Sequence, residues 1–174
     1  KKYLIKRLLS PKYKYSAKSW LSPKMPHHEV KEGTFKALKD FNPTVRVGDK
    51  DMKLQKLWSL YEKAKQSNNK KDIDKYQEYL KFAVIRVPAD SVSGARSLIF
   101  DGYLAERGTS VVTKNNDNTY LGGADKDSDT VFLYQGLDKS IHKTLQKNSK
   151  EWQDKNDVWT DSAPSELLTG KPDP

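Results

Sequence analysis

Three aspartates at alternate positions form the pattern in this sequence with the most potential for chemistry. Asp125, Asp127 and Asp129 lie between a glycine pair at 122–123 and a β-branched, aromatic run that begins at Thr130. On a tight loop, alternating carboxylates can converge on one hard cation. Mg²⁺ accepts such oxygen ligands and keeps water and substrate phosphates in its other positions. The spacing therefore predicts a magnesium site.

Two other structures can produce the same spacing. An EF-hand loop needs glycine at its sixth position and a bidentate glutamate at its twelfth, but these positions hold Thr130 and Gly136. A predicted strand also stands where the EF-hand has a helix, so an EF-hand is disfavoured. A polar hairpin turn, in which the aspartates only cap backbone amides, stays open as the alternative.

Several classes of protein are excluded by composition. The 174 residues include no cysteine, which removes disulfides, thiol nucleophiles and thiolate metal sites. No apolar run approaches the roughly 20 residues of a membrane span, and no secretory signal peptide is seen. The pair His27 and His28 has no third ligand at a suitable spacing, so a surface pair is favoured over a metal site. The first residue is Lys1, and we expect the chain to be a piece of a larger polypeptide.

Charge divides the sequence into unlike halves. Residues 1–83 hold 21 Lys/Arg and 9 Asp/Glu, whereas residues 84–174 hold 11 and 14. Prolines break the first 26 residues into short pieces, which predicts an extended basic arm over residues 1–49. Its tyrosines alternate with lysines that are suited to phosphate contacts, namely Lys12, Lys14, Lys18 and Lys24. An arm that packs on a partner protein is the alternative.

The remaining sequence predicts helices on either side of a β-rich unit. Apolar residues recur at intervals of three and four over residues 50–83, which predicts a helical hairpin. Short β-branched and aromatic runs predict strands within residues 84–136. A third helix is expected over residues 137–160, followed by an irregular tail at 161–174. The predicted fold class is α+β, with a small β-barrel flanked by amphipathic helices.

A second motif lies upstream of the aspartates. Arg86-Val87-Pro88 precedes Asp125 by 39 residues and is followed by Ser93-Gly94-Ala95-Arg96 and a strand ending at Phe100. This arrangement resembles the catalytic double-psi β-barrel in the largest subunit of multisubunit-type RNA polymerases. It looks closest to the divergent single-chain relatives encoded by crAss-like and other large bacteriophages, some of which are packaged in the virion.

The resemblance implies specific roles. The three aspartates would bind Mg²⁺, Arg86 would lie near the RNA end and the incoming nucleotide, and Arg96 would be a further nucleic-acid contact. Lys126 and Ser128 replace an apolar residue and a glycine of the family pattern, which predicts a weakened metal site. The family builds its active centre from two barrels, so this chain alone is expected to be inert.

The partners implied are DNA, RNA, nucleotides and the rest of a larger polypeptide or other virion proteins. The implied location is the phage virion and then the bacterial host cytoplasm. One alternative is a noncatalytic virion structural or cargo protein that keeps the barrel as architecture, with an arm that binds DNA or a neighbouring subunit. Another is an unrelated nucleic-acid-binding module, which would be favoured if residues 84–136 were not a barrel.

Overall fold

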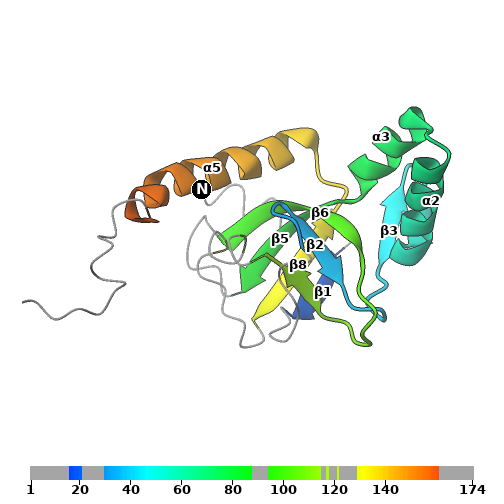
Figure 1. The fold of residues 1–174 in the computed structure, drawn as a ribbon, viewed down its shortest axis with the longest axis horizontal. Coiled ribbons are helices and arrows are strands. Elements are labelled where there is room, and N and C mark those ends of the chain that lie inside the picture. Colours follow the sequence, from blue (N-terminus) through cyan, green and yellow to red (C-terminus); the bar gives the residue numbers. More distant parts are fainter. Residues whose placement is uncertain are drawn as a thin grey trace, which may run out of the picture.

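The chain has an α+β fold centred on a curled β-sheet (Figure 1). The computed structural model describes residues 16–20, 30–87, 94–114, 117, 121 and 129–160. The strands are β1 Ser16–Trp20, β2 Thr34–Ala37, β3 Thr44–Val47, β4 Lys50–Lys53, β5 Lys81–Val87, β6 Ala95–Tyr103, β7 Val111–Thr113 and β8 Thr130–Gln135. The helices are α2 Leu54–Gln66, α3 Lys70–Tyr79 and α5 Lys139–Thr160.

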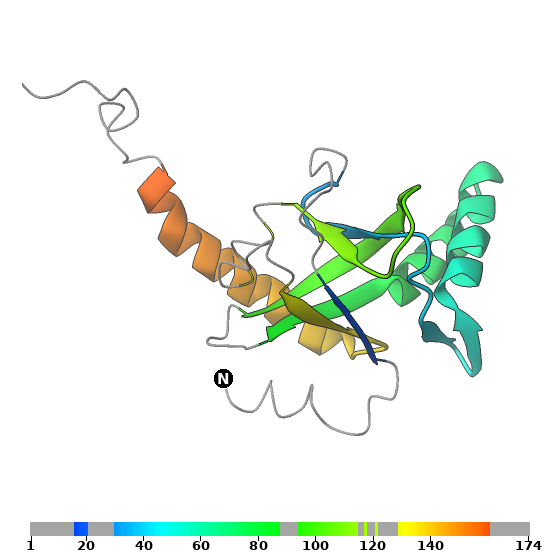
Figure 2. The same ribbon diagram turned by 90° about the horizontal axis from the view of Figure 1, so that it is seen from below.

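Six of the strands form one mixed sheet in the order β1-β8-β5-β6-β2-β7, and β3 pairs with β4 in a separate hairpin. The β2–β6 pair is parallel, and the other pairs in the described sheet are antiparallel. Figure 2 shows that the sheet curls into a half-barrel. The prediction of an α+β fold is therefore confirmed, and a barrel-like fold is compatible with the curvature.

The two faces of the sheet belong to different cores, because successive side chains of a strand point to opposite sides. In β5, Phe82 and Val84 join the main core, whereas Ala83 and Ile85 pack in the layer beneath α5. The main core contains Phe35, Leu54, Leu57, Leu98, Phe100 and Leu133 among its buried members. Ile141 and Leu145 supply the apolar face of α5. This layering fixes α5 across β5, β6 and β8.

The predicted hairpin contains two helices, but its limits differ from the predicted 50–83. Asn69 caps α3 by accepting a hydrogen bond from the Asp72 backbone N–H at 3.4 Å. Lys50–Lys53 is the strand β4 instead, because its residues pair with β3 in the register Val45↔Met52. Residues 81–83 begin β5, where pairing with β6 and β8 replaces helical hydrogen bonds.

The prediction of an arm separate from the β unit needs correction within the described part of residues 1–49. The strand β1 pairs with β8, and β2 lies between β6 and β7. Phe35 and Ala37 are fully buried in the main core. The sheet therefore extends beyond the predicted 84–136, since strands from the basic half complete it. Residues 1–15 and 21–29 lie outside the described residues.

The C-terminal helix agrees with the expected 137–160 to within two residues, because α5 spans Lys139–Thr160. The predicted tail at 161–174 lies outside the described residues. Within the part of the chain that the structure describes, no helix combines the length and the apolar character needed to cross a membrane.

Candidate functional site

The pairing of β5 with β8 brings one residue of each sequence motif together, Arg86 and Asp129. In this antiparallel register Arg86 lies opposite Val131, and Val87 lies opposite Thr130. Asp129 directly precedes β8, so its carboxylate reaches the end of β5 that carries Arg86. The Arg86 Nε and Asp129 Oδ2 atoms are 2.8 Å apart, in an ion pair whose side chains are 18% and 22% exposed. Two residues that are 43 positions apart in the sequence thus share one site.

Only part of the predicted magnesium site falls in the described residues. Asp125 and Asp127 lie outside them, so their convergence on Asp129 stays a prediction. Three carboxylates are a donor set that Mg²⁺ accepts. At Asp129, however, the guanidinium of Arg86 already supplies a positive charge. Among the described residues, which exclude Asp125 and Asp127, no group of three His, Cys, Asp or Glu side chains could hold a metal ion.

A second charged constellation joins β6 to the segment before β2. Asp117 is fully buried, and its Oδ1 lies 2.9 Å from the Arg96 Nη2 atom. The backbone N–H of Gly33 donates to both Asp117 oxygens, at 3.3 and 3.1 Å. Glu32 lies farther from Arg96, at 3.7 Å. The network ties residues 32–33 to β6 through buried charge.

Burial dominates the electrostatics of Asp117. Loss of solvent raises the pKa of this carboxyl from 3.8 to about 6, although Arg96 and the Gly33 N–H favour the ionised form. Glu32 adds a smaller contribution that also raises the pKa. The carboxyl group therefore titrates close to neutral pH.

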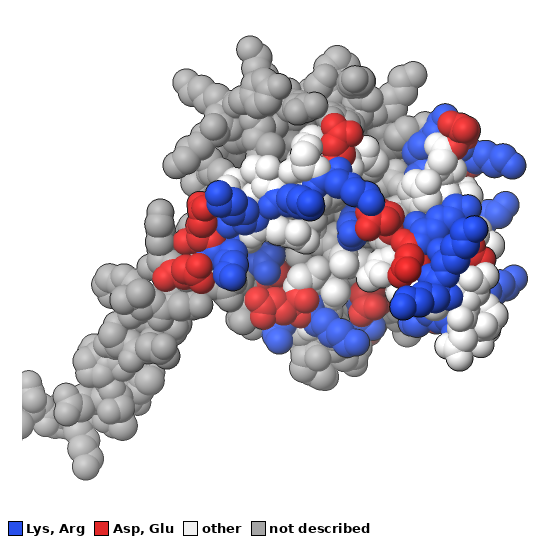
Figure 3. Space-filling model, turned by 90° about the horizontal axis from the view of Figure 1, so that it is seen from above, with Lys and Arg blue, Asp and Glu red and all other residues white. Residues whose placement is uncertain are grey.

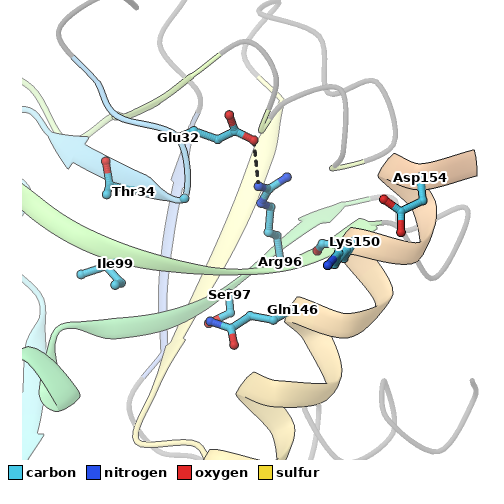
Figure 4. Close-up of a pocket in the computed structure, with 10 residues that line it drawn as sticks. Glu32, Thr34, Arg96, Ser97, Ile99, Gln146, Lys150 and Asp154 are labelled. Carbon is cyan, nitrogen blue, oxygen red and sulfur yellow. Dashed lines mark ion pairs between the residues drawn. The ribbon is translucent and has the colours of Figure 1, made fainter. Parts of the chain in front are cut away.

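An open cavity of about 560 Å³ lies beside this network, between α5 and the sheet. Figure 4 shows Arg96 and Glu32 at one side, with Lys150 and Asp154 from α5 at the other. Ser97 and Gln146 lie below Arg96 in this view and also line the cavity. The lining carries both signs of charge.

Ser97 also contacts a buried histidine. Its Oγ atom is 2.6 Å from His142 Nδ1 of α5, and His142 is 8% exposed. Burial lowers the pKa of His142, and the nearby Lys81 lowers it further, whereas Glu78 opposes the shift. The imidazole is therefore neutral at pH 7, and the contact joins α5 to β6. The sequence analysis found no such pair, because its members are 45 residues apart on elements whose packing no local pattern encodes.

The predicted nucleic-acid contacts lie at different places. Lys18 is exposed on β1, in register with Phe132 of β8. Arg96 is 9% exposed, and its charge is engaged by Asp117 and Glu32. The other predicted contacts lie outside the described residues, as do the two neighbouring histidines: Lys12, Lys14, Lys24, His27 and His28.

No family model matches the chain, and a search of curated proteins found no match either. The functional interpretation therefore depends on the residues and their geometry.

Proposed function

We propose that this chain is a segment of a phage DNA-directed RNA polymerase-like protein that contributes a magnesium-binding loop for nucleotidyl transfer. The observation that supports the proposal is the ion pair between Arg86 and Asp129. The motif resemblance expects these two residues to share an active centre, and they come from separate strands. The half-barrel sheet that holds them is compatible with a barrel-like fold.

In this proposal Asp125, Asp127 and Asp129 hold Mg²⁺, which when bound acidifies the RNA 3′-hydroxyl and neutralises phosphate charge. The hydroxyl would lose its proton to water and its oxygen would form a bond to the nucleotide α-phosphorus. The bond from that phosphorus to the bridging oxygen of the β-phosphate would break, and pyrophosphate would leave. Arg86 pairs with Asp129 and, by the resemblance, lies near the RNA end and the incoming nucleotide. Lys126, next to Asp125 and Asp127 in the sequence, would attract the same anionic substrates.

The second barrel of the active centre would come from another part of the larger polypeptide. We therefore expect no polymerisation by this chain alone. In the same proposal the whole protein travels in the virion and acts in the host cytoplasm, with DNA, RNA and nucleotides as partners.

A noncatalytic virion or cargo protein is the second candidate, and the same ion pair favours it in one respect. A guanidinium 2.8 Å from Asp129 supplies positive charge that a metal would otherwise supply. Together with Lys126 and Ser128, it is consistent with a barrel that serves as architecture.

Binding of Mn²⁺, measured by calorimetry and by paramagnetic resonance on the 174-residue chain, distinguishes the two candidates. We expect one ion per chain, with binding abolished in Asp127→Asn and unchanged in Asp74→Asn, which alters an exposed carboxylate on α3. Arg86→Gln should tighten binding, because Arg86 competes with the metal for Asp129. Ser128→Gly should leave the affinity equal or better, since glycine tolerates positive φ. Absence of binding that depends on Asp127 would reject the metal site and favour the architectural candidate.

A further inference from the structure

A stripe of lysines runs along the exposed side of α5. It consists of Lys139, Lys143, Lys147 and Lys150, all of them exposed, and is called here the lysine stripe. Residues 139–150 contain no Asp or Glu. Their spacing of four, four and three residues places the lysines on one helical face, with intervals of about 6, 6 and 4.5 Å along the axis at 1.5 Å per residue.

The stripe is unfavourable for the helix that carries it. Lysines four residues apart repel one another on a helix surface. Lys139 and Lys143 also lie near the N-terminus, where the helix dipole disfavours cations, and the first turn contains no acidic residue. The packing of α5 does not need them, since its opposite face is anchored by Ile141 and Leu145.

Two lysines elsewhere in the described structure are held in closer ion pairs. Lys65 of α2 and Lys81 of β5 each form an ion pair with a glutamate three residues earlier, at 3.1 and 2.7 Å. Within the stripe, Lys147 has a longer contact of 3.7 Å to Glu151, and both side chains are more than half exposed. Such an exposed pair contributes little and leaves the lysine available to a stronger anion.

The stripe continues a basic face. Figure 3 shows Lys and Arg side chains in a band across the side of the molecule that carries α5, and again over the α2–α3 hairpin. At the far end of the stripe, Lys150 lines the cavity that also contains Arg96. A linear anion along α5 would therefore meet positive charge over the length of the stripe.

We propose that the lysine stripe binds the phosphate backbone of nucleic acid. A row of lysines on one helix face presents repeated positive charge to a strand that carries one negative charge for roughly each 3.4 Å of axis. The mobile ammonium groups suit backbone contacts without base readout. This proposal does not depend on the metal loop, because the stripe belongs to a different element from the aspartates.

The test compares two double variants of the 174-residue chain that change the net charge equally. Lys143→Gln/Lys147→Gln removes two stripe lysines, and the control, Lys56→Gln/Lys63→Gln, removes two exposed lysines of α2. Fluorescence anisotropy with labelled duplex DNA is recorded from 50 to 200 mM salt. The slope of log affinity against log salt should fall by about 1.8 in the stripe variant, or about 0.9 for each lost contact.

Between 50 and 200 mM salt, the factor by which affinity falls should therefore be about 12 times smaller for the stripe variant than for the unmodified chain. With single-stranded RNA the expected change in slope is about 1.4. Titrations with duplex DNA and with single-stranded RNA therefore distinguish the two nucleic acids. Three results would each overturn the proposal. These are an equal change of slope in both variants, no change of slope in either variant, and no binding by the unmodified chain at 50 mM salt. Glutamine retains helix propensity, and circular dichroism should show that the stripe variant melts no earlier than the unmodified chain. If that variant does unfold earlier, Lys139→Gln/Lys150→Gln provides the same comparison.

Discussion

The buried carboxyl group of Asp117 gives the fold a pH-dependent stability that a single substitution can isolate. Asp117 accepts hydrogen bonds from the Gly33 N–H and pairs with Arg96 at 2.9 Å, yet burial raises its pKa to about 6. In Asp117→Asn the side chain keeps its size and an oxygen that accepts from Gly33. It can no longer ionise, so the variant lacks the pH-dependent contribution.

The sign of the effect follows from the raised pKa. The folded state binds this proton more tightly than the unfolded chain does, so the stabilising contribution is complete below about pH 3.8 and is lost as the pH rises through about 6. A shift of about 2 pKa units corresponds to about 3 kcal/mol over the whole window. Between pH 5 and 7.5 the same linkage gives about 1.4 kcal/mol. We therefore expect Asp117→Asn to destabilise the protein by about 1.4 kcal/mol more at pH 5 than at pH 7.5.

Urea unfolding followed by tryptophan fluorescence, at both pH values, measures this difference. The exposed carboxylate of α3 provides the control, because Asp74→Asn should show the same effect at each pH. A larger destabilisation of Asp117→Asn at pH 7.5 than at pH 5 would refute the reasoning. It would mean that attraction to Arg96 exceeds the cost of burying the carboxylate.

Two further predictions concern close packing and a buried imidazole. A Cβ at Gly102 would lie 2.9 Å from the Trp58 ring with φ at +102°, so Gly102→Ala should cost about 2–4 kcal/mol in urea unfolding. Gly136→Ala, where φ is +79° and nothing lies within 4 Å, should cost only about 1–2 kcal/mol. Burial should make His142 titrate below 6.5 in an NMR pH series, and stability should fall as the pH drops from 6.5 toward that lowered pKa. An apparent pKa above 6.5 would contradict the buried, neutral imidazole that contacts Ser97.

The sequence allowed prediction of the elements whose patterns are long and local. In the helix α5 and in the strands β5 and β8, the regular spacing of the apolar residues can be recognised despite the neighbouring charged residues. The strand β2 is short, and its Thr-Phe-Lys-Ala sequence lies in a lysine-rich region. Its place in the sheet is set by β6 and β7, which lie far away in the chain. The net charge and the prolines of residues 1–49 therefore led to the prediction of an arm, although the residues of β2 alternate between the two faces of a strand.

The sequence pointed to the candidate site only through the two motifs that contain Arg86 and Asp129. The resemblance gave Asp129 a metal-binding role and Arg86 a place near the nucleotide, but it did not predict their ion pair. The register of β5 with β8 explains how the two residues meet. Asp117 lies in a run of polar residues, 115–118, which gives no sign of burial in the sequence. Its burial depends on Gly33, 84 residues earlier, and on Arg96. Charge networks of this kind are products of tertiary packing, and local composition does not encode them.

The role of residues 1–49 can be tested by dividing the chain at residue 49. The fragment 50–174 lacks β2, whose Phe35 ring lies 5.5 Å from the Phe82 ring and 5.4 Å from the Phe100 ring at the centre of the core. Loss of one buried phenylalanine costs about 3–5 kcal/mol, against a typical stability of about 5–15 kcal/mol. The fragment also loses the pairing of β1 with β8. We therefore expect it to show no cooperative unfolding by circular dichroism, and Phe35→Ala in the 174-residue chain to lose about 3–5 kcal/mol. A fragment 50–174 that unfolds cooperatively at the urea midpoint of the whole chain would instead establish residues 1–49 as a separate arm, and would contradict the sheet order in which β2 lies between β6 and β7.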